Sequence, residues 1–169
     1  MSDYKTTKYR GITKFYFNKI IDEIILIGNL NKIGDFKILD YGCGEKILSS
    51  KVKNVLNYDI NPDYNEMTDI HKANFNVVVM NHVLMYMSIQ DIEKVFKDLL
   101  KKKNLKFIFG LGTNNIIVQT TAKIIYNKNA YKDTKSTYID QKNVIKKFFK
   151  IIKKKNIYFA TELLLAEPL

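Results

Sequence analysis

The sequence is poor in cysteine and arginine and has no long apolar run. Cys43 is the one cysteine in 169 residues, which excludes a disulfide framework and a multi-cysteine zinc site. Asp22 and Glu23 interrupt the longest apolar candidate, residues 20–27, so no stretch reaches the roughly 18 residues of a membrane span. Residues 1–10 lack the apolar core of a secretory signal. We therefore expect a soluble, cytoplasmic protein with no metal site.

The charge is strongly positive, but its composition weakens a nucleic-acid interpretation. The net charge is +11, from 28 basic and 17 acidic residues. A basic surface is the usual electrostatic signature of phosphate binding. However, Arg10 is the only arginine, and arginine is the side chain preferred for bidentate phosphate contacts. Abundant lysine, asparagine and isoleucine indicate a coding bias instead. Nucleic acid is therefore a possible partner that the sequence does not favour.

Hydrophobic periodicity and turn residues predict alternating helices and strands. The length and the 46% hydrophobic content are typical of one folded domain, residues 1–169. Gly28 and Asn29 are suited to end the first helix, and Ser88 to begin a later one. The expected helices are 12–28, 45–53, 89–102, 114–126 and 139–147. The expected strands are 36–40, 55–59, 76–80, 106–111, 148–152 and 157–166, with a turn at 153–156.

The order of these elements predicts a doubly wound α/β fold. Repeated strand–helix–strand units give parallel neighbours, with helices on both faces of the sheet. The last two strands are joined too tightly to be parallel, so the sheet should carry an antiparallel strand at its end. Residues 65–75 are short and polar, and form either an abbreviated third strand or a loop. Residues 1–30 are a helical segment before this core, and 127–138 are an insertion on its substrate side.

An apolar strand that breaks into a glycine turn is the central feature. The segment runs Ile38-Leu39-Asp40-Tyr41-Gly42-Cys43-Gly44-Glu45-Lys46-Ile47. Glycines there let the backbone approach a nucleotide-like ligand. Ile47 stands where a dinucleotide fingerprint has its third glycine, which argues against a nicotinamide or flavin dehydrogenase. A phosphate-binding P-loop is excluded because no Gly-Lys-Ser/Thr follows.

Two acids at neighbouring strand ends suggest the kind of ligand. Asp40 precedes the glycines, and Asp59 ends the next strand after 19 residues, the length of a strand–helix–strand unit. A carboxylate at Asp40 disfavours a pyrophosphate and favours a cationic group. An acid after the second strand suits ribose hydroxyls. S-adenosylmethionine carries both an ammonium–sulfonium end and a ribose.

These residues resemble the first motif of the class I, Rossmann-like, S-adenosylmethionine-dependent methyltransferases, hh-D/E-h-G-C-G-x-G. Lys46 replaces its last glycine. The family's strand-four segment is similar to residues 75–86, with Asn76 in place of aspartate and Met85-Tyr86 in place of Glu-His. The resemblance implies a seven-stranded type of sheet over residues 36–166. It also implies S-adenosylmethionine as cofactor and S-adenosylhomocysteine as product.

The resemblance further implies which residues bind the cofactor. The methionine end of the cofactor would meet the glycine turn, and its ribose and adenine would meet the end of the second strand. A pair of residues in the segment that follows would also contact the adenine. The backbone near the end of strand four would face the cofactor. The resulting assignments are Asp40, Tyr41, Gly42 and Gly44; Asp59 and Ile60; Asp69 and Ile70; and Asn81.

The chemistry of methyl transfer requires few catalytic groups. The reaction is an in-line displacement, so orientation of the two reactants carries much of the rate. His82 lies at the mouth of strand four and is a candidate general base, although a lone histidine is more often structural. Cys43 is interpreted as a small turn residue, because no neighbouring residue in the sequence indicates an activated thiolate.

We predict an enzyme that methylates a small molecule near residues 82–86, 110–115 and 127–138. Two alternatives stay open: an RNA methyltransferase, supported by charge, and a non-catalytic cofactor-binding or partner module, supported by the altered motif positions. The sequence leaves the oligomeric state undetermined.

Overall fold

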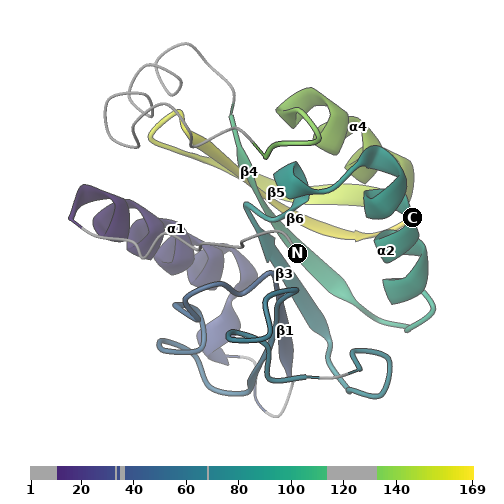
Figure 1. Cartoon of the computed structure of the whole chain (residues 1–169), viewed down its shortest axis with the longest axis horizontal. Helices are drawn as coiled ribbons and strands as arrows, with labels where there is room; N and C mark the ends of the chain where they lie inside the picture. Colours follow the sequence, from purple (N-terminus) through teal and green to yellow (C-terminus); the bar gives the residue numbers. More distant parts are fainter. Residues whose placement is uncertain (1–10, 33, 35–36, 68, 114–132) are drawn as a thin grey trace.

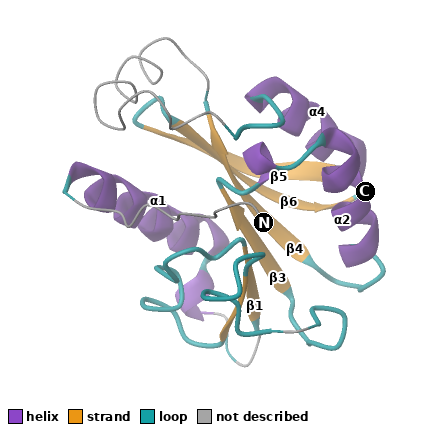
Figure 2. Ribbon diagram, viewed as in Figure 1, coloured by secondary structure: helices purple, strands orange, loops and turns teal. Residues whose placement is uncertain are grey.

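The computed structural model describes residues 11–32, 34, 37–67, 69–113 and 133–169, which form a six-stranded α/β sheet (Figures 1 and 2). The helices are α1 (Ile12–Gly28), α2 (Ile89–Leu99) and α4 (Tyr138–Phe148), with short 3₁₀ turns η1 (Leu30–Lys32) and η2 (Leu84–Tyr86). The strands are β1 (Ile38–Tyr41), β2 (Val55–Tyr58), β3 (Val77–Asn81), β4 (Lys106–Gly112), β5 (Phe149–Ile157) and β6 (Thr161–Pro168).

The strand order is β2-β1-β3-β4-β6-β5, which confirms the predicted fold class. The first four strands in this order are parallel, and β6 pairs with β4 and β5 antiparallel. Parallel strands bring their carboxyl ends to one edge of the sheet. Because β6 runs the other way, its first residues meet that same edge, with Thr161 opposite Gly112.

Helices cover both faces of the sheet, as predicted (Figure 1). The α1 face buries a cluster that includes Ile20, Ile24, Ile38, Val79 and Ile108. The α2 and α4 face buries a larger, aromatic cluster built around Phe96, Phe107, Phe109 and Phe149. Each of these four rings lies within 6 Å of at least one other in the set. Edge-to-face and stacked contacts of this kind add to the burial of apolar area.

Cap residues end α1 and begin α2 as the sequence indicated, and a further cap begins α4. Asn29, in a left-handed conformation, caps the end of α1, and its backbone N–H bonds the carbonyls of Ile25 and Leu26. The Ser88 side chain accepts a hydrogen bond from the Asp91 N–H at the start of α2. Helix α4 begins with a capping box between Thr137 and Asp140.

Residues 45–53 do not form the predicted helix; they form a series of turns (Figure 2). Leu48 and Val52 are nevertheless buried, as the pattern required, because turns present them to the same core. The described part of segment 65–75 is also turn and loop, so of the two forms left open it takes the loop. The edge next to β2 therefore carries no further strand in the described chain, and the sheet has six strands instead of seven.

The terminal hairpin turns later than predicted. The expected turn at 153–156 is part of β5, and the chain reverses at residues 158–160. Polar lysines suggested a turn, but β5 is the edge strand, where lysine is favoured because it discourages pairing with another chain. A register shift between Ile151 and Lys153 bends this strand. Tyr158 and Phe159 make the reversal at φ values of 48° and 58°.

The predicted helix at 114–126 and most of the insertion at 127–138 lie outside the described residues. Among the helices that the structure describes, none combines the length and apolar character needed to cross a bilayer.

Candidate active site at the carboxyl ends of the strands

The glycine turn folds back onto the end of β2. The backbone N–H groups of Gly42 and Cys43 both donate to the Tyr58 carbonyl, at 2.7 and 3.1 Å. Gly42 has φ 80°, a left-handed conformation that glycine adopts without strain. A Cβ at Gly42 would lie 2.4 Å from Val83 Cγ2. Both the dihedral angle and the packing therefore require glycine at this position.

Gly44, the second glycine of the turn, has open space at its Cβ position, whereas Gly42 is packed there. Gly44 has φ 47°, and no heavy atom lies within 4 Å of the position of an added Cβ. Its N–H donates to Asp59 Oδ2 at 2.9 Å. Lys46, which replaces the last motif glycine, has φ 57°, so the turn keeps a glycine-like backbone there. The Lys46 ammonium pairs with Glu66 at 2.7 Å.

Asp59 anchors the glycine turn as well as ending the second strand. Its Oδ2 accepts from Gly44, and its Oδ1 accepts from the Asn61 N–H at 2.9 Å. An ionised carboxylate has about four acceptor positions, so both oxygens keep capacity for a ligand. Asp59 can therefore hold the turn and still accept hydrogen bonds from a pair of hydroxyls.

Asp40 is a buried acid that no other described residue pairs with. Its exposed fraction is 4%, and no described group donates a hydrogen bond to its carboxyl oxygens. Burial, and then the nearby Asp59 charge, raise the pKa of Asp40 to about 7. A buried carboxylate is costly unless it is paired, and a cationic ligand would provide that pairing. The Asp40 carboxylate thus fits an ammonium or sulfonium group.

Asn57 and Glu66 belong to this region and were missed from the sequence. Asn57 lies opposite Asp40 in the β1–β2 register and is 3% exposed. Its Nδ2 donates to Glu66 Oε2 at 2.7 Å and to Ser49 Oγ at 3.2 Å, while its buried Oδ1 has no partner among the described residues. An asparagine in the middle of a short apolar strand was the available signal.

The remaining cofactor-binding candidates occupy different surroundings. Ile60 is 74% exposed beside Asp59, and the Tyr41 ring packs at a tilt against the Tyr58 ring, with centroids 4.9 Å apart. Asp69 lies in the loop, where its Oδ1 accepts from the His71 N–H at 2.9 Å. Ile70 packs against the core under α2 and α4. Their roles in cofactor binding stay predictions.

At the end of β3, Asn81 and His82 occupy space that two glycines leave open. A Cβ on Gly110 would lie 2.2 Å from Asn81 Oδ1, and one on Gly112 would lie 3.3 Å from His82 Cε1. The buried Asn81 Oδ1 has no partner in the described chain. His82 has φ 54°, and its N–H donates to the Gly110 carbonyl at 2.8 Å.

His82 belongs to a hydrogen-bonded chain that sequence reasoning did not find. Its Nε2 lies 2.7 Å from Thr161 Oγ1, and Thr161 Oγ1 lies 2.5 Å from the Tyr16 hydroxyl. The Phe17 ring meets the His82 ring edge-on at 5.5 Å. Burial lowers the pKa of His82 to about 4, so the ring is neutral at physiological pH.

A second buried polar group faces α4. Glu162, which is 4% exposed, accepts hydrogen bonds from the Tyr138 hydroxyl at 2.7 Å and from the Lys142 ammonium at 2.8 Å. Thr161 and Glu162 interrupt an otherwise apolar strand, which was the sequence signal for both. Because each bonds a helix on its own side of the sheet, they join α1 and α4 to the carboxyl edge.

Cys43 behaves as the small turn residue that was predicted. It is 9% exposed, and burial raises the pKa of its thiol to about 12. Its Sγ lies 3.6 Å from the Tyr64 carbonyl. A thiol with so high a pKa carries almost no thiolate at neutral pH.

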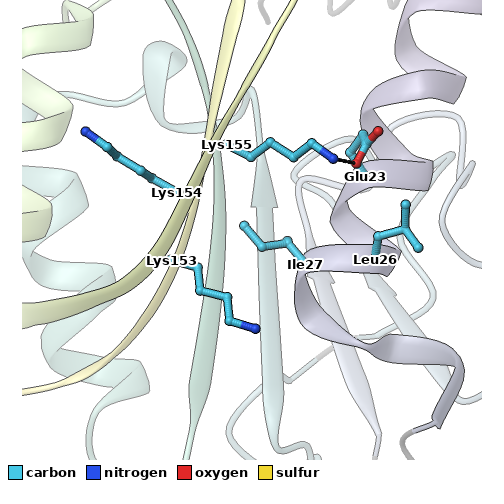
Figure 3. A pocket seen from close by; sticks show the side chains of 6 residues that line it. All are labelled: Glu23, Leu26, Ile27, Lys153, Lys154 and Lys155. Carbon is cyan, nitrogen blue, oxygen red and sulfur yellow. Dashed lines mark hydrogen bonds and ion pairs between the residues drawn. The ribbon is translucent and has the colours of Figure 1, made fainter.

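A lysine-lined pocket lies at the opposite edge of the sheet from the glycine turn (Figure 3). Lys153, Lys154 and Lys155 of β5 line it together with Leu26 and Ile27 of α1. Lys155 and Glu23 form an ion pair across it. It contains neither of the acids of the glycine-turn region. Within the described residues, no group of three His, Cys, Asp or Glu side chains could hold a metal ion.

Comparison with known proteins identifies the fold. No protein-family model and no curated protein sequence matches the chain. Magnesium protoporphyrin IX methyltransferase (ChlM) from Synechocystis PCC 6803, crystallised with bound SAH, matches with a TM-score of 0.63 and 13% identity over 96% of this chain and 90% of that chain. The PH0226 protein from Pyrococcus horikoshii OT3 matches with a TM-score of 0.66 and 14% identity over the whole of both chains.

A SAM-dependent methyltransferase from Archaeoglobus fulgidus also matches, with a TM-score of 0.60 and 10% identity over 92% of this chain and 97% of that chain. The chain therefore has the fold of the SAM-dependent methyltransferases, and the predicted resemblance is confirmed at the level of the fold.

Proposed function

We propose that this protein is an S-adenosylmethionine-dependent methyltransferase that acts on a small molecule. The observation that carries the proposal is Asp40, a buried acid with no partner among the described residues, beside an open glycine turn. The ammonium–sulfonium end of S-adenosylmethionine supplies the positive charge that such an acid needs. Solved neighbours of the same fold are crystallised with SAM or SAH.

The chain's own residues divide the binding task. Asp40 would pair with the cationic end, and the open space at Gly44 would let the backbone approach it. Asp59 keeps acceptor capacity for the ribose hydroxyls while it fixes the turn. Asn81 Oδ1, which has no partner in the described part of the chain, would accept a hydrogen bond from the cofactor or the acceptor. When bound, the cofactor supplies an activated methyl group on sulfur.

Catalysis would then depend on orientation. The acceptor would lie beyond the ends of β3 and β4, where residues 82–86 and 110–113 meet the start of β6. Holding the nucleophile in line with the methyl group supplies much of the rate. A small-molecule acceptor is supported by neighbours such as ChlM, which is a magnesium protoporphyrin IX methyltransferase.

Isothermal titration calorimetry with S-adenosylmethionine and S-adenosylhomocysteine tests the proposal. Wild-type protein should bind both, and Asp59→Ala should weaken each about 100-fold, since loss of hydrogen bonds to a charged group costs about 1.5–3 kcal/mol each. Asp63→Ala is the matched control, because this exposed acid lies in the same loop. Failure of the wild-type protein to bind either compound would reject the proposal.

Because Asp59 also holds the Gly44 N–H, the folded state of each variant needs a separate check. A circular dichroism melt identifies a variant that has lost its fold. Asp59→Asn supplies a milder comparison, since its amide keeps one acceptor oxygen. An Asp59→Ala variant that is folded and binds as tightly as wild type would remove the ribose assignment.

The RNA alternative rests on positive charge, to which Lys153 and Lys154 on the β5 edge contribute. RNA binding at low salt with a steep salt dependence would support it. The partner-module alternative would be supported by cofactor binding without methyl transfer to any acceptor.

A further inference from the structure

His82 is held in an unusual backbone conformation at the end of β3. Its φ of 54° is uncommon for a residue other than glycine, and such strain tends to persist at functional sites. The ring lies against Gly112, the last residue of β4, with Nδ1 3.4 Å from the position that a Cβ would take. Any side chain at Gly112 would therefore crowd the Nδ1 edge of the ring.

Three distant parts of the chain meet at the other ring nitrogen. His82 Nε2 contacts Thr161 at the start of β6, and Thr161 contacts Tyr16 of α1. The sequence separations are 79 and 145 residues. Thr161 is fully buried, so its hydroxyl needs partners within the protein. Tyr16 and His82 are those partners, and together they fix the rotation of the imidazole ring.

The pattern of partners makes the two ring nitrogens of His82 different. A neutral imidazole carries one N–H and one bare nitrogen. Nε2 has the Thr161 oxygen as its partner, whereas Nδ1 has none among the described residues. Nδ1 is not one of the fully buried polar atoms that lack a partner, so it is open to a ligand. With the proton on Nε2, where the Thr161 oxygen can accept it, Nδ1 is bare beside Gly112.

We propose that Thr161 and Tyr16 are positioning residues that hold His82 as the Nε2–H tautomer, so that Nδ1 serves as the base for an acceptor that must lose a proton, such as a hydroxyl. This inference rests on the proposed function, because a base has a use here only if an acceptor binds. When the hydroxyl O–H bond breaks, the proton goes to Nδ1 and the electron pair stays on the nucleophilic oxygen. The proton is released to water after the product leaves.

Nuclear magnetic resonance measures the tautomer directly. The chain has only two histidines, His71 and His82, so long-range proton–nitrogen spectra of the ¹⁵N-labelled protein are simple to assign. The exposed His71 is removed with His71→Gln to assign the second ring. At neutral pH the His82 signals should show a protonated Nε2 and a bare Nδ1. A protonated Nδ1 in the wild-type protein would overturn the proposal.

Matched variants separate a positioning role from a merely structural one. Thr161→Val removes the hydroxyl with little change of shape, and should shift the tautomer ratio by up to about tenfold, since one hydrogen bond contributes at most about 1.4 kcal/mol. Thr161→Ser restores the hydroxyl and should restore the ratio. Tyr16→Phe should have a smaller effect in the same direction. A ratio unchanged in Thr161→Val would contradict the proposal.

Calorimetry with S-adenosylhomocysteine on the same samples keeps the two proposals apart. Thr161→Val should bind this compound as wild type does, because Thr161 is placed on the acceptor side. If the wild type shows the predicted tautomer but binds no S-adenosylhomocysteine, the proposed function fails and His82 is a structural residue.

Discussion

The two halves of the carboxyl edge are built on opposite electrostatic principles. The half at β1 and β2 contains Asp40, an acid that is buried and has no partner within the described ranges, and Asp59, whose oxygens accept backbone N–H groups. The half at β3, β4 and β6 contains a neutral imidazole in a chain of hydroxyl partners. The first half is incomplete without a cation, whereas the second is nearly satisfied within the protein. This difference agrees with the proposed division, in which the first half would bind the cofactor and the second would orient an acceptor.

Replacement of Asp40 should give the largest effect, with opposite signs on binding and stability. We expect Asp40→Asn to weaken S-adenosylmethionine binding more than 100-fold, because a buried charged pair costs about 2–5 kcal/mol to break from one side. The same change should stabilise the ligand-free protein at neutral pH, since it removes a buried unpaired charge. Calorimetry and urea unfolding measure the two effects. If Asp40→Asn lost stability and kept its affinity for S-adenosylmethionine, the β1–β2 half would not need a cation and the contrast between the halves would be wrong.

Within the β1–β2 half, alanine should cost more stability at Gly42 than at Gly44. Gly42→Ala should lower the free energy of unfolding by about 2.5 kcal/mol, from an unfavourable φ and a clash with Val83. Gly44→Ala should cost about 1 kcal/mol, from the dihedral angle alone, because its side is open. Urea unfolding of both variants tests this, with equal losses contradicting the assigned packing.

The two halves of the carboxyl edge should also make opposite contributions to the dependence of stability on pH. The pKa of Asp40 is raised to about 7, so its protonated form stabilises the fold fully below pH 3.8, and this contribution is lost as the pH rises toward 7. His82, with its pKa lowered to about 4, acts oppositely: its contribution is complete above pH 6.5 and lost as the pH falls toward 4.

Asp40→Asn should therefore gain stability relative to wild type as the pH rises from 4 to 7. A full shift from 3.8 to about 7 corresponds to ~4 kcal/mol, and relaxation of the site should reduce the gain to about 2 kcal/mol. Wild-type affinity for S-adenosylmethionine should rise over the same range, because Asp40 must lose its proton to pair with a cation. Unfolding and calorimetry across this pH range give both slopes; parallel stability curves for the two proteins would rule out the assigned pKa.

The smallest expected effects concern the glycines beside Asn81 and His82. Gly110→Ala places a Cβ 2.2 Å from Asn81 Oδ1 and should destabilise the fold by about 1.5 kcal/mol. Gly112→Ala meets His82 at 3.3 Å and should change stability by less than about 0.5 kcal/mol. Thermal unfolding compares them. If Gly112→Ala proved the more damaging variant, the placement of the His82 ring would be wrong.

The sequence by itself determined the α/β order, the main caps and the glycine-turn half of the site. Asp40, Gly42, Gly44 and Asp59 lie within 20 residues, so local strand and turn chemistry places them together. The helix at 45–53 was wrong because a series of turns buries Leu48 and Val52 as well, so their spacing did not require a helix. The hairpin turn at 153–156 was wrong because its lysines lie on β5 at the sheet edge.

Only the tertiary structure decided the second half. Thr161 reaches His82 because β6 runs antiparallel to β4, and Tyr16 of α1 in turn reaches Thr161. No local pattern encodes these contacts. Likewise, the sequence placed an acid at position 40, but its unpaired burial and raised pKa follow from the surrounding fold. Periodicity and turn residues report what a segment prefers, whereas partners and desolvation depend on which distant segments pack against it.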